Sequence, residues 1–435
     1  MRWITLAFFL CRPMLASAAT PPLSLHDAIG LAVEHNLTAL LSRAETRRAR
    51  SKTLESAVSL LPQLMGTMSQ QRVYRENLAA LGFNFSSGGF PSMLGPYNVF
   101  DARLHLVQTL FDAESWSLWR SAQSDARAAS SEEALAAEQV SGAAALAYIE
   151  SLRARRTIVA AQAGEDLAVQ LMTLAREEKK AGAAAGIDVA RAETREAEER
   201  LRLLDAKTAS NDADLRLKRL LGLAMGEPVV LADLLTTVST GSWREADAQT
   251  AAFAGRWELK VASARLESQD DAVRAAKLER LPTVTAAGDV GLSGVKPNST
   301  ARTTGSLGVG LSLPIFDGRR AEAKTREAKS SQDEASERLS DMRLQVEEDV
   351  RHSLDTLDES AERAQTAALA VTLAERELEL ARGRFSAGVG DNVEVVDAQA
   401  KVARDEDAQT AALAGLWSAR VNLALALGVM KDFSL

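Results

Sequence analysis

The stretch "RFSAGVGDNVEVVDAQ" (Arg384–Gln399) interrupts a long run of helix-like sequence with Gly388 and Gly390. A weaker copy, "REEKKAGAAAGIDVARAE" (Arg176–Glu193), lies in the first half of the chain. Glycine adopts positive φ at little cost, so it suits the point where a helix ends and the chain reverses. Each stretch therefore predicts the tip of a helical hairpin, and the repetition indicates that the chain is duplicated.

Further landmarks of the two halves follow one another in the same order. Pro62 corresponds to Pro282, "VQTLFD" ending at Asp112 corresponds to "SLPIFD" ending at Asp317, and "LKRLLG" corresponds to "LALALG". Each half then has the order helix, strand, strand, long helix, break, helix. We expect a first repeat at residues 19–222, an equatorial linker at 223–245 and a second repeat at 246–435.

Within each repeat the patterns predict two strands and two helices. We expect strands at about 63–74 and 99–111, a long helix at 112–180 and a helix at 187–222 in the first repeat. We expect strands at about 283–295 and 302–316, a long helix at 318–385 and a helix at 391–428 in the second.

The segment "TGSLGVGLSLPIF" has the clearest strand pattern. Leu307, Val309, Leu311 and Leu313 alternate with glycine and serine, so one face is apolar and the other is small or polar. A strand of a membrane β-barrel alternates in this way, because one face contacts lipid and the other faces the water inside. A half-buried strand of a soluble sandwich fits the same pattern equally well.

The predicted long helices favour the membrane interpretation. Between Gly318 and Arg382 there is no proline and no internal glycine. At about 1.5 Å per residue such a helix is roughly 100 Å long, too long for a compact domain. Its seam follows a heptad-like spacing, with members Val346, Val350, Ser353, Leu357, Ala361, Ala364, Ala368 and Val371. A solvated helical bundle or a filament-forming coiled coil would show the same seam.

Four strands cannot close a barrel, since about eight is the usual minimum. Open sheet edges do not occur in lipid. If the strands enter a membrane, several chains must therefore share one barrel, and each chain must continue into long helices.

The N-terminus predicts export. Arg2, the apolar stretch "WITLAFFL" and Ala16-Ser17-Ala18 have the features of a signal peptide at residues 1–18. The only cysteine, Cys11, lies within it, and its neighbours make a poor lipid-attachment site. The net charge is −8 without a basic patch, so nucleic acid is not an expected partner.

Together the motifs "LSLPIFDGRR", "RFSAGVGDNVEVVDAQ" and "VNLALALG", within a duplicated plan, resemble the TolC-like outer-membrane efflux proteins, also called outer membrane factors. The resemblance implies a homotrimer with four strands per chain in a twelve-stranded membrane β-barrel, joined to a long α-helical barrel that crosses the periplasm. It implies two partners besides outer-membrane lipid: a periplasmic adaptor (membrane fusion) protein and an inner-membrane pump or ABC transporter.

The resemblance also assigns roles to residues. Glu394 and Asp397 match an acidic ring at the periplasmic gate, and Asp188 stands at the corresponding place in the first repeat. Helix capping explains Glu394 and Asp188 as well, and a solvated helix face explains Asp397. The adaptor-docking tips would be Gly182, Ala184, Gly186, Ile187, Gly388, Val389, Gly390 and Val393. Pro314, Phe316 and Phe111 would form the strand-helix junction.

The expected function is an exit duct of a tripartite efflux or type I secretion system, which carries small molecules or polypeptides to the exterior. The main alternative is a secreted coiled-coil structural protein, and a third is a porin that works alone. The sequence has none of the common catalytic or nucleotide-binding fingerprints, and its four histidines are scattered. We expect no enzymatic activity, no cofactor and no metal site.

Overall fold

The computed structural model describes residues 22–77, 93–182, 185–236, 243–298, 300–387, 389, 392–430 and 433. The chain divides into two compact units. The sheet unit comprises Leu40–Ala136 and Arg256–Glu348, and the hairpin unit comprises Met1–Ala39, Ala137–Gly255 and Asp349–Leu435. The expected signal peptide lies outside the described residues.

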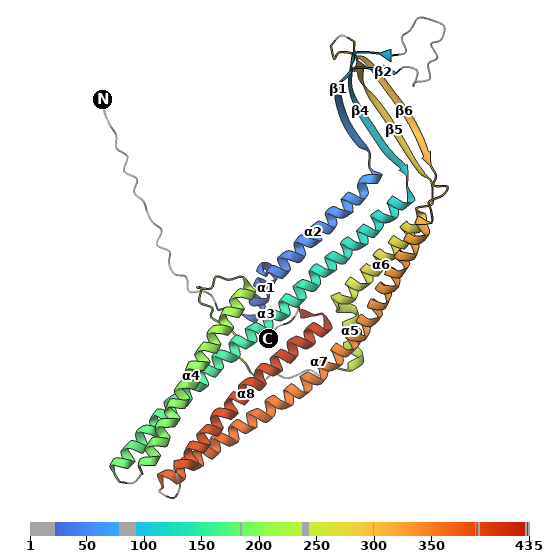
Figure 1. Ribbon diagram of the computed structural model, residues 1–435. Coiled ribbons are helices and arrows are strands. Elements are labelled where there is room, and N and C mark those ends of the chain that lie inside the picture. The colour runs from blue at the N-terminus through green and yellow to red at the C-terminus, as the bar shows by residue number, and fades with distance from the viewer. Residues whose placement is uncertain are drawn as a thin grey trace, which may run out of the picture. The chain divides into compact units, whose positions relative to one another are not determined.

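The sheet unit contains one antiparallel four-stranded sheet in the order β1-β4-β5-β6 (Figure 1). Its strands are β1 (Gln63–Val73), β4 (Tyr97–Phe111), β5 (Thr283–Gly294) and β6 (Arg302–Ser312). Two short strands, β2 (Glu76–Asn77) and β3 (Met93–Leu94), form a separate pair. Both halves of the sequence thus contribute two strands to one sheet, with β1 and β6 at its edges.

Four helical segments of this unit follow the same order as the strands. They are α2 (Leu37–Ala57), the first part of α3 (Ala113–Lys180), α6 (Trp257–Leu278) and the first part of α7 (Arg320–Ser386). Each helix directly precedes or follows one strand of the sheet, as Figure 1 shows.

Hydrogen bonds between neighbouring helices fix that order. Thr53 of α2 donates to the carbonyl of Ala122 in α3 over 3.0 Å. The hydroxyls of Ser121 in α3 and Ser268 in α6 are 3.1 Å apart. Gln332 of α7 donates to Asp270 of α6 over 2.6 Å. The layer therefore runs α2-α3-α6-α7, with α2 and α7 at its two ends.

The hairpin unit contains α1 (Leu25–His35), α4 (Gly186–Leu221), α5 (Glu245–Gly255), α8 (Asn392–Leu427) and the second parts of α3 and α7. Its core is rich in alanine, so the helices approach closely. Ala175 of α3 packs with Val189 and Ala192 of α4, and Leu378 and Ala381 of α7 form a cluster with α8. The unit is thus built around two helical hairpins.

Where the unit's N-terminal segment meets the α4–α5 connection, Leu23 forms a parallel bridge with Leu231. The buried Tyr148 hydroxyl lies 2.8 Å from the Leu23 carbonyl oxygen and 2.7 Å from Asp233 Oδ2. Burial is the main reason why the pKa of Tyr148 lies above its ordinary value. The phenol therefore stays protonated and ties the two connecting segments to α3.

The predicted combination of a four-stranded sheet with very long helices is confirmed: α3 has 68 residues and α7 has 67. One strand is shorter than we expected. β6 ends at Ser312, because Pro314 has no N–H to donate to the sheet. Leu313, expected on the strand face, follows the strand instead.

By length and composition, α8 over Val393–Leu427 could cross a membrane, but 61% of its most apolar window is buried inside the protein. That burial and its alanine content are typical of a helix packed in a core.

Candidate functional site

The tip of the first hairpin joins α3 to α4. Gly182 has φ +78°, and nothing lies within 4 Å of the position that its Cβ would occupy. The positive φ thus explains the glycine, as the sequence suggested. Gly186 and Ile187 begin α4, whereas Ala184 lies outside the described residues.

Asp188 stands at the start of α4 and serves the helix itself. Its Oδ2 accepts the backbone N–H of Ala185 over 3.0 Å. Since Ala185 has no capping side chain, this contact satisfies a donor at the helix entrance. A weaker ion pair with Arg191 spans 3.8 Å. The geometry thus accounts for Asp188 as a helix-start residue.

The tip of the second hairpin lies between Ser386, the last residue of α7, and Asn392, the first of α8. Gly388 and Gly390 lie outside the described residues. Val389 is exposed and Val393 is half-buried. Glu394 pairs with Arg384 of α7, with 3.2 Å between Arg384 Nε and Glu394 Oε2. This ion pair joins α7 to α8, and the positive charge of Arg384 compensates the negative charge of Glu394.

Asp397 has a different environment, one turn further along α8. Its side chain is exposed and has no hydrogen-bond or ion-pair partner within the described part of the chain. It borders a groove of 550 Å³ between α7 and α8, and a second of 520 Å³ between α4 and α8. Of the three predicted gate carboxylates, only Asp397 lacks a charged or hydrogen-bonded partner in the part of the chain that the structure describes.

A link between the two hairpins escaped the sequence analysis. Arg202 of α4 reaches α8, where it lies 2.8 Å from Asp407 and donates to the carbonyl of Ala403 over 3.2 Å. Arg202 also pairs with Glu199, which is 2% exposed and contacts Arg195 as well. Arginines at three or four residues from a glutamate signal such a pair on one helix, but no local spacing indicates Asp407.

Glu406, the carboxylate next to Asp407 in the sequence, has a shifted pKa. Burial raises the pKa of Glu406 above its ordinary value, and the neighbouring Glu375 adds to the effect. The surface between α4 and α8 therefore carries half-buried charges of both signs around the buried Glu199.

The two faces of the sheet have opposite chemistry. Registers place Leu307, Val309 and Leu311 of β6 opposite Gly288, Ala286 and Val284 of β5. Leu307 is 87% exposed. The same face also carries Leu64, Met68, Leu104, Leu106, Val290 and Leu292. The other face carries Thr67, Ser69, Asp101, Arg103, His105, Thr285, Asp289, Thr304 and Ser306.

Each strand-to-helix junction contains an aspartate cap. Asp112 accepts the N–H of Ser115 over 3.0 Å at the start of α3, and Asp317 accepts the N–H of Ala321 over 3.0 Å at the start of α7. The hydrogen bond from Ala321 is the main reason why the pKa of Asp317 lies below its ordinary value. In the sequence these two aspartates stand out only as landmarks of the duplication.

Aromatic side chains surround these junctions. Phe111 pairs with Val284 after a bulge at the end of β4, whereas Phe316 is exposed after Pro314. Trp116 and Trp119 follow in α3, with ring centroids 5.0 Å apart. Aromatic rings near the ends of lipid-facing strands are typical of the membrane interface.

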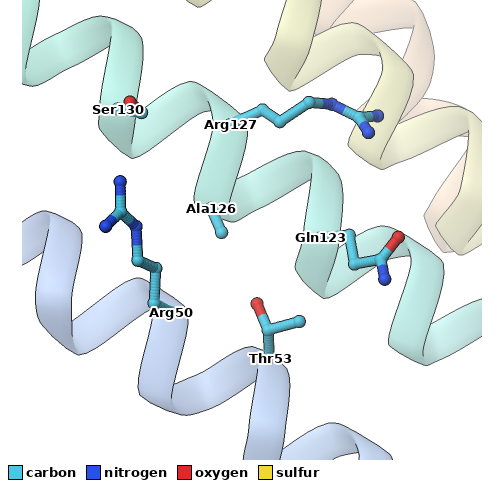
Figure 2. A pocket seen from close by; sticks show the side chains of 6 residues that line it. All are labelled: Arg50, Thr53, Gln123, Ala126, Arg127 and Ser130. Atoms are coloured by element: carbon cyan, nitrogen blue, oxygen red, sulfur yellow. The ribbon is translucent and has the colours of Figure 1, made fainter.

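A groove of 440 Å³ lies between α2 and α3 and is lined by Arg50, Thr53, Gln123, Ala126, Arg127 and Ser130 (Figure 2). Arg127 points away from Arg50 and pairs with Glu267 of α6 over 2.7 Å, and Thr53 bonds the backbone of α3. The polar side chains thus hold helices together. Within the described residues, no three His, Cys, Asp or Glu side chains are placed to hold a metal ion.

Residues 250–429 match the family model described as Outer membrane efflux protein. The resemblance to outer-membrane efflux proteins is confirmed. The match covers the second repeat, from α5 to the end of α8. Among curated proteins no sequence matches the chain.

Solved structures of outer-membrane channels share the fold along nearly the whole chain. The outer membrane protein VceC from Vibrio cholerae is 18% identical, with a TM-score of 0.78 over 93% of this chain and 96% of that one. The CmeC outer membrane channel of Campylobacter jejuni is 19% identical, with a TM-score of 0.79 over 94% and 86%. The MtrE outer membrane channel of Neisseria gonorrhoeae, in its open state, is 17% identical, with 0.79 over 94% and 90%.

Proposed function

We propose that this protein is the outer-membrane exit duct of a tripartite efflux or type I secretion system, and that it works as a homotrimer. The observation that carries the proposal is the four-stranded sheet, whose apolar face is exposed and whose edge strands β1 and β6 have no further strand partner among the described residues.

Assembly of several copies into a closed barrel accounts for the exposed apolar face and for the two edge strands. Such a sheet is viable in lipid only when β6 of one copy pairs with β1 of the next. Three copies supply twelve strands, an even number within the range of membrane barrels. Leu307, Val309 and Leu311 then face lipid, and the polar face lines an aqueous lumen.

The helices support the same arrangement. Because the layer runs in strand order, ring closure of the sheet also brings α7 of one copy beside α2 of the next. Both end helices expose large apolar side chains within the sheet unit, Leu54 on α2 and Leu344 on α7. Burial of these leucines between copies would stabilise a helical wall that continues the lumen through the periplasm.

The hairpin tips are the ends that meet the adaptor. Gly182, Gly186, Ile187, Val389 and Val393 are small or apolar, and Ala184, Gly388 and Gly390 extend the same composition. Such tips fit the ends of helical hairpins from a periplasmic adaptor, which connects the duct to an inner-membrane pump or ABC transporter. Asp397 of each copy contributes to an acidic gate, and the energy for transport comes from the pump.

To test this proposal, the protein is expressed with its expected signal peptide, residues 1–18, and is extracted from the outer membrane. We expect a trimer that resists SDS until heated, and discrete ion conductance after reconstitution into a planar bilayer. A Gly182→Pro variant should keep the conductance but abolish drug export in cells that carry the pump, since it distorts a docking tip. A detergent-free, non-conducting protein would instead support the alternative, a secreted coiled-coil structural protein.

A further inference from the structure

Arg103 is the centre of a charged cluster on the polar face of the sheet, far along the sequence from the hairpin tips. Its Nε and Nη2 donate to the two carboxylate oxygens of Asp101, each over 2.7 Å. Its Nη1 donates to Asp289 of β5, and Ser306 of β6 donates to the other oxygen of Asp289. The cluster therefore joins three of the four strands.

The guanidinium lies flat against the sheet because of one glycine. In the registers, Arg103 stands opposite Gly291 of β5, and Gly291 stands opposite Thr304 of β6. Arg103 Nη2 lies 3.4 Å from Thr304 Oγ1, so the side chain crosses β5 where no side chain obstructs it. A Cβ at Gly291 would lie 2.2 Å from the Cβ of Arg103. Only glycine at this position permits β5 to approach Arg103 this closely.

Flat packing also explains the low exposure of the charges. Although they stand on the open face of a single sheet, the side chains of Arg103 and Asp289 are only 24% and 17% exposed. Long charged side chains on a surface normally extend into water. Here two carboxylates, a hydroxyl and the crossing over Gly291 hold the cation against the wall.

We propose that Arg103, Asp101 and Asp289 form a charge belt that tunes the ion selectivity of the barrel lumen, in addition to any gate at the tips. The inference rests on the proposed function, in which the polar face lines the lumen. Each copy contributes two carboxylates and one guanidinium to the belt. Arg302, one row further along β6 and opposite Ser293, adds a cation beside it.

The belt makes opposite predictions for its two kinds of charge. Loss of the guanidinium leaves Asp101 and Asp289 facing the lumen without compensation, which favours cations. Loss of the carboxylates releases the guanidinium into the lumen, which favours anions. Rings of charged side chains select ions in this way.

The test measures the reversal potential of the purified, full-length trimer in planar bilayers under a KCl gradient. The background is the double variant E394Q/D397N, which removes the carboxylates at the tips. We expect R103Q to raise the K⁺/Cl⁻ permeability ratio by about twofold or more, and D101N/D289N to lower it by a similar factor. Both shifts should shrink in 1 M salt, where charges are screened beyond roughly 3 Å.

Two further variants separate charge from structure. R103K keeps the charge but cannot form the bidentate contact, so its permeability ratio should equal that of the background while its trimer dissociates at lower temperature. R72Q is the matched control, because Arg72 loses the same charge from the opposite face of the sheet. It should leave the ratio unchanged.

The proposal is overturned if the background conducts and R103Q has the same ratio as R72Q. If R103Q does not assemble, D289N decides the question: it must lower the ratio, and an unchanged ratio contradicts the belt. A background protein that forms no conducting trimer contradicts the proposed function instead.

Discussion

Arg202 of α4 and Asp407 of α8 lie 2.8 Å apart and tie the first helical hairpin to the second. The arginine side chain is mostly buried, so the contact is less screened than a pair on the open surface. We propose that opening of the duct separates the two hairpins at their tips, in which case the Arg202–Asp407 contact opposes opening.

We expect D407N to favour the open duct, since it weakens the link by about 1 kcal/mol. The mean conductance in planar bilayers should increase, and cells should become more permeable to large antibiotics. E150Q is the control, because it removes an ion pair with Arg153 that lies within one helix. Equal conductance in D407N and E150Q would contradict this role.

The different environments of Asp397 and Glu394 predict unequal effects on ion selectivity. D397N removes a carboxylate that has no partner in the described structure, so the K⁺/Cl⁻ permeability ratio should fall. The double variant R384Q/E394Q removes an ion pair whose two charges compensate each other, so it should leave the ratio nearly unchanged. A fall as large as that of D397N would contradict this assignment. Reversal potentials of the two variants make the comparison.

The apolar face of β6 should not tolerate charge. An arginine at the bilayer midplane costs about 2–4 kcal/mol in a membrane barrel, so we expect L307R to reduce the yield of SDS-resistant trimer strongly. T285R places the same side chain on the polar face of β5 and should assemble. If both variants assemble equally well, the assignment of the lipid-facing surface is wrong.

The proposed trimer should lose stability in acid partly through Glu279, whose side chain is 6% exposed and pairs with Arg320 and Lys324. Burial acts to raise the pKa of Glu279, but the two cations outweigh it and hold the pKa below its ordinary value. Stabilisation from a lowered pKa is present above the pKa of the unfolded chain, and it is lost as pH falls through the folded one.

The variant E279Q tests this contribution. At pH 7 its trimer should be about 1 kcal/mol less stable than the wild type. It should therefore melt at a lower temperature. The difference should disappear as the pH falls below the pKa of the folded carboxyl. A difference that stays constant between pH 7 and pH 3 would contradict the role of the ionised Glu279.

Much of the architecture followed from patterns that are local in the sequence. Alternation identified the strand through Leu307 and Leu311, and the absence of proline and glycine between Gly318 and Arg382 identified most of α7. Buried positions such as Val346, Val350 and Leu357 follow the expected seam. These features repeat with a fixed period, so a single sequence reveals them.

The contacts between distant segments could not be predicted in the same way. Nothing near Arg103 indicates that Gly291 stands opposite it, since the strand register brings the two residues together across half of the chain. Likewise, the Arg384 pairing of Glu394 depends on how two helices pack. β6 is shorter than expected for a local reason, because Pro314 has no N–H to donate. The alternation of apolar and small residues continues past the end of the strand and does not reveal it.

Disulfide crosslinking between copies tests the central claim most directly, because Cys11 in the expected signal peptide is the only native cysteine. One cysteine replaces Ser69 of β1, and a second is moved along the polar-face positions of β6. The account predicts that one register gives a covalent ladder that ends at three chains in native outer membranes. A protein that stays monomeric in every register, or a ladder that continues beyond three, would contradict it.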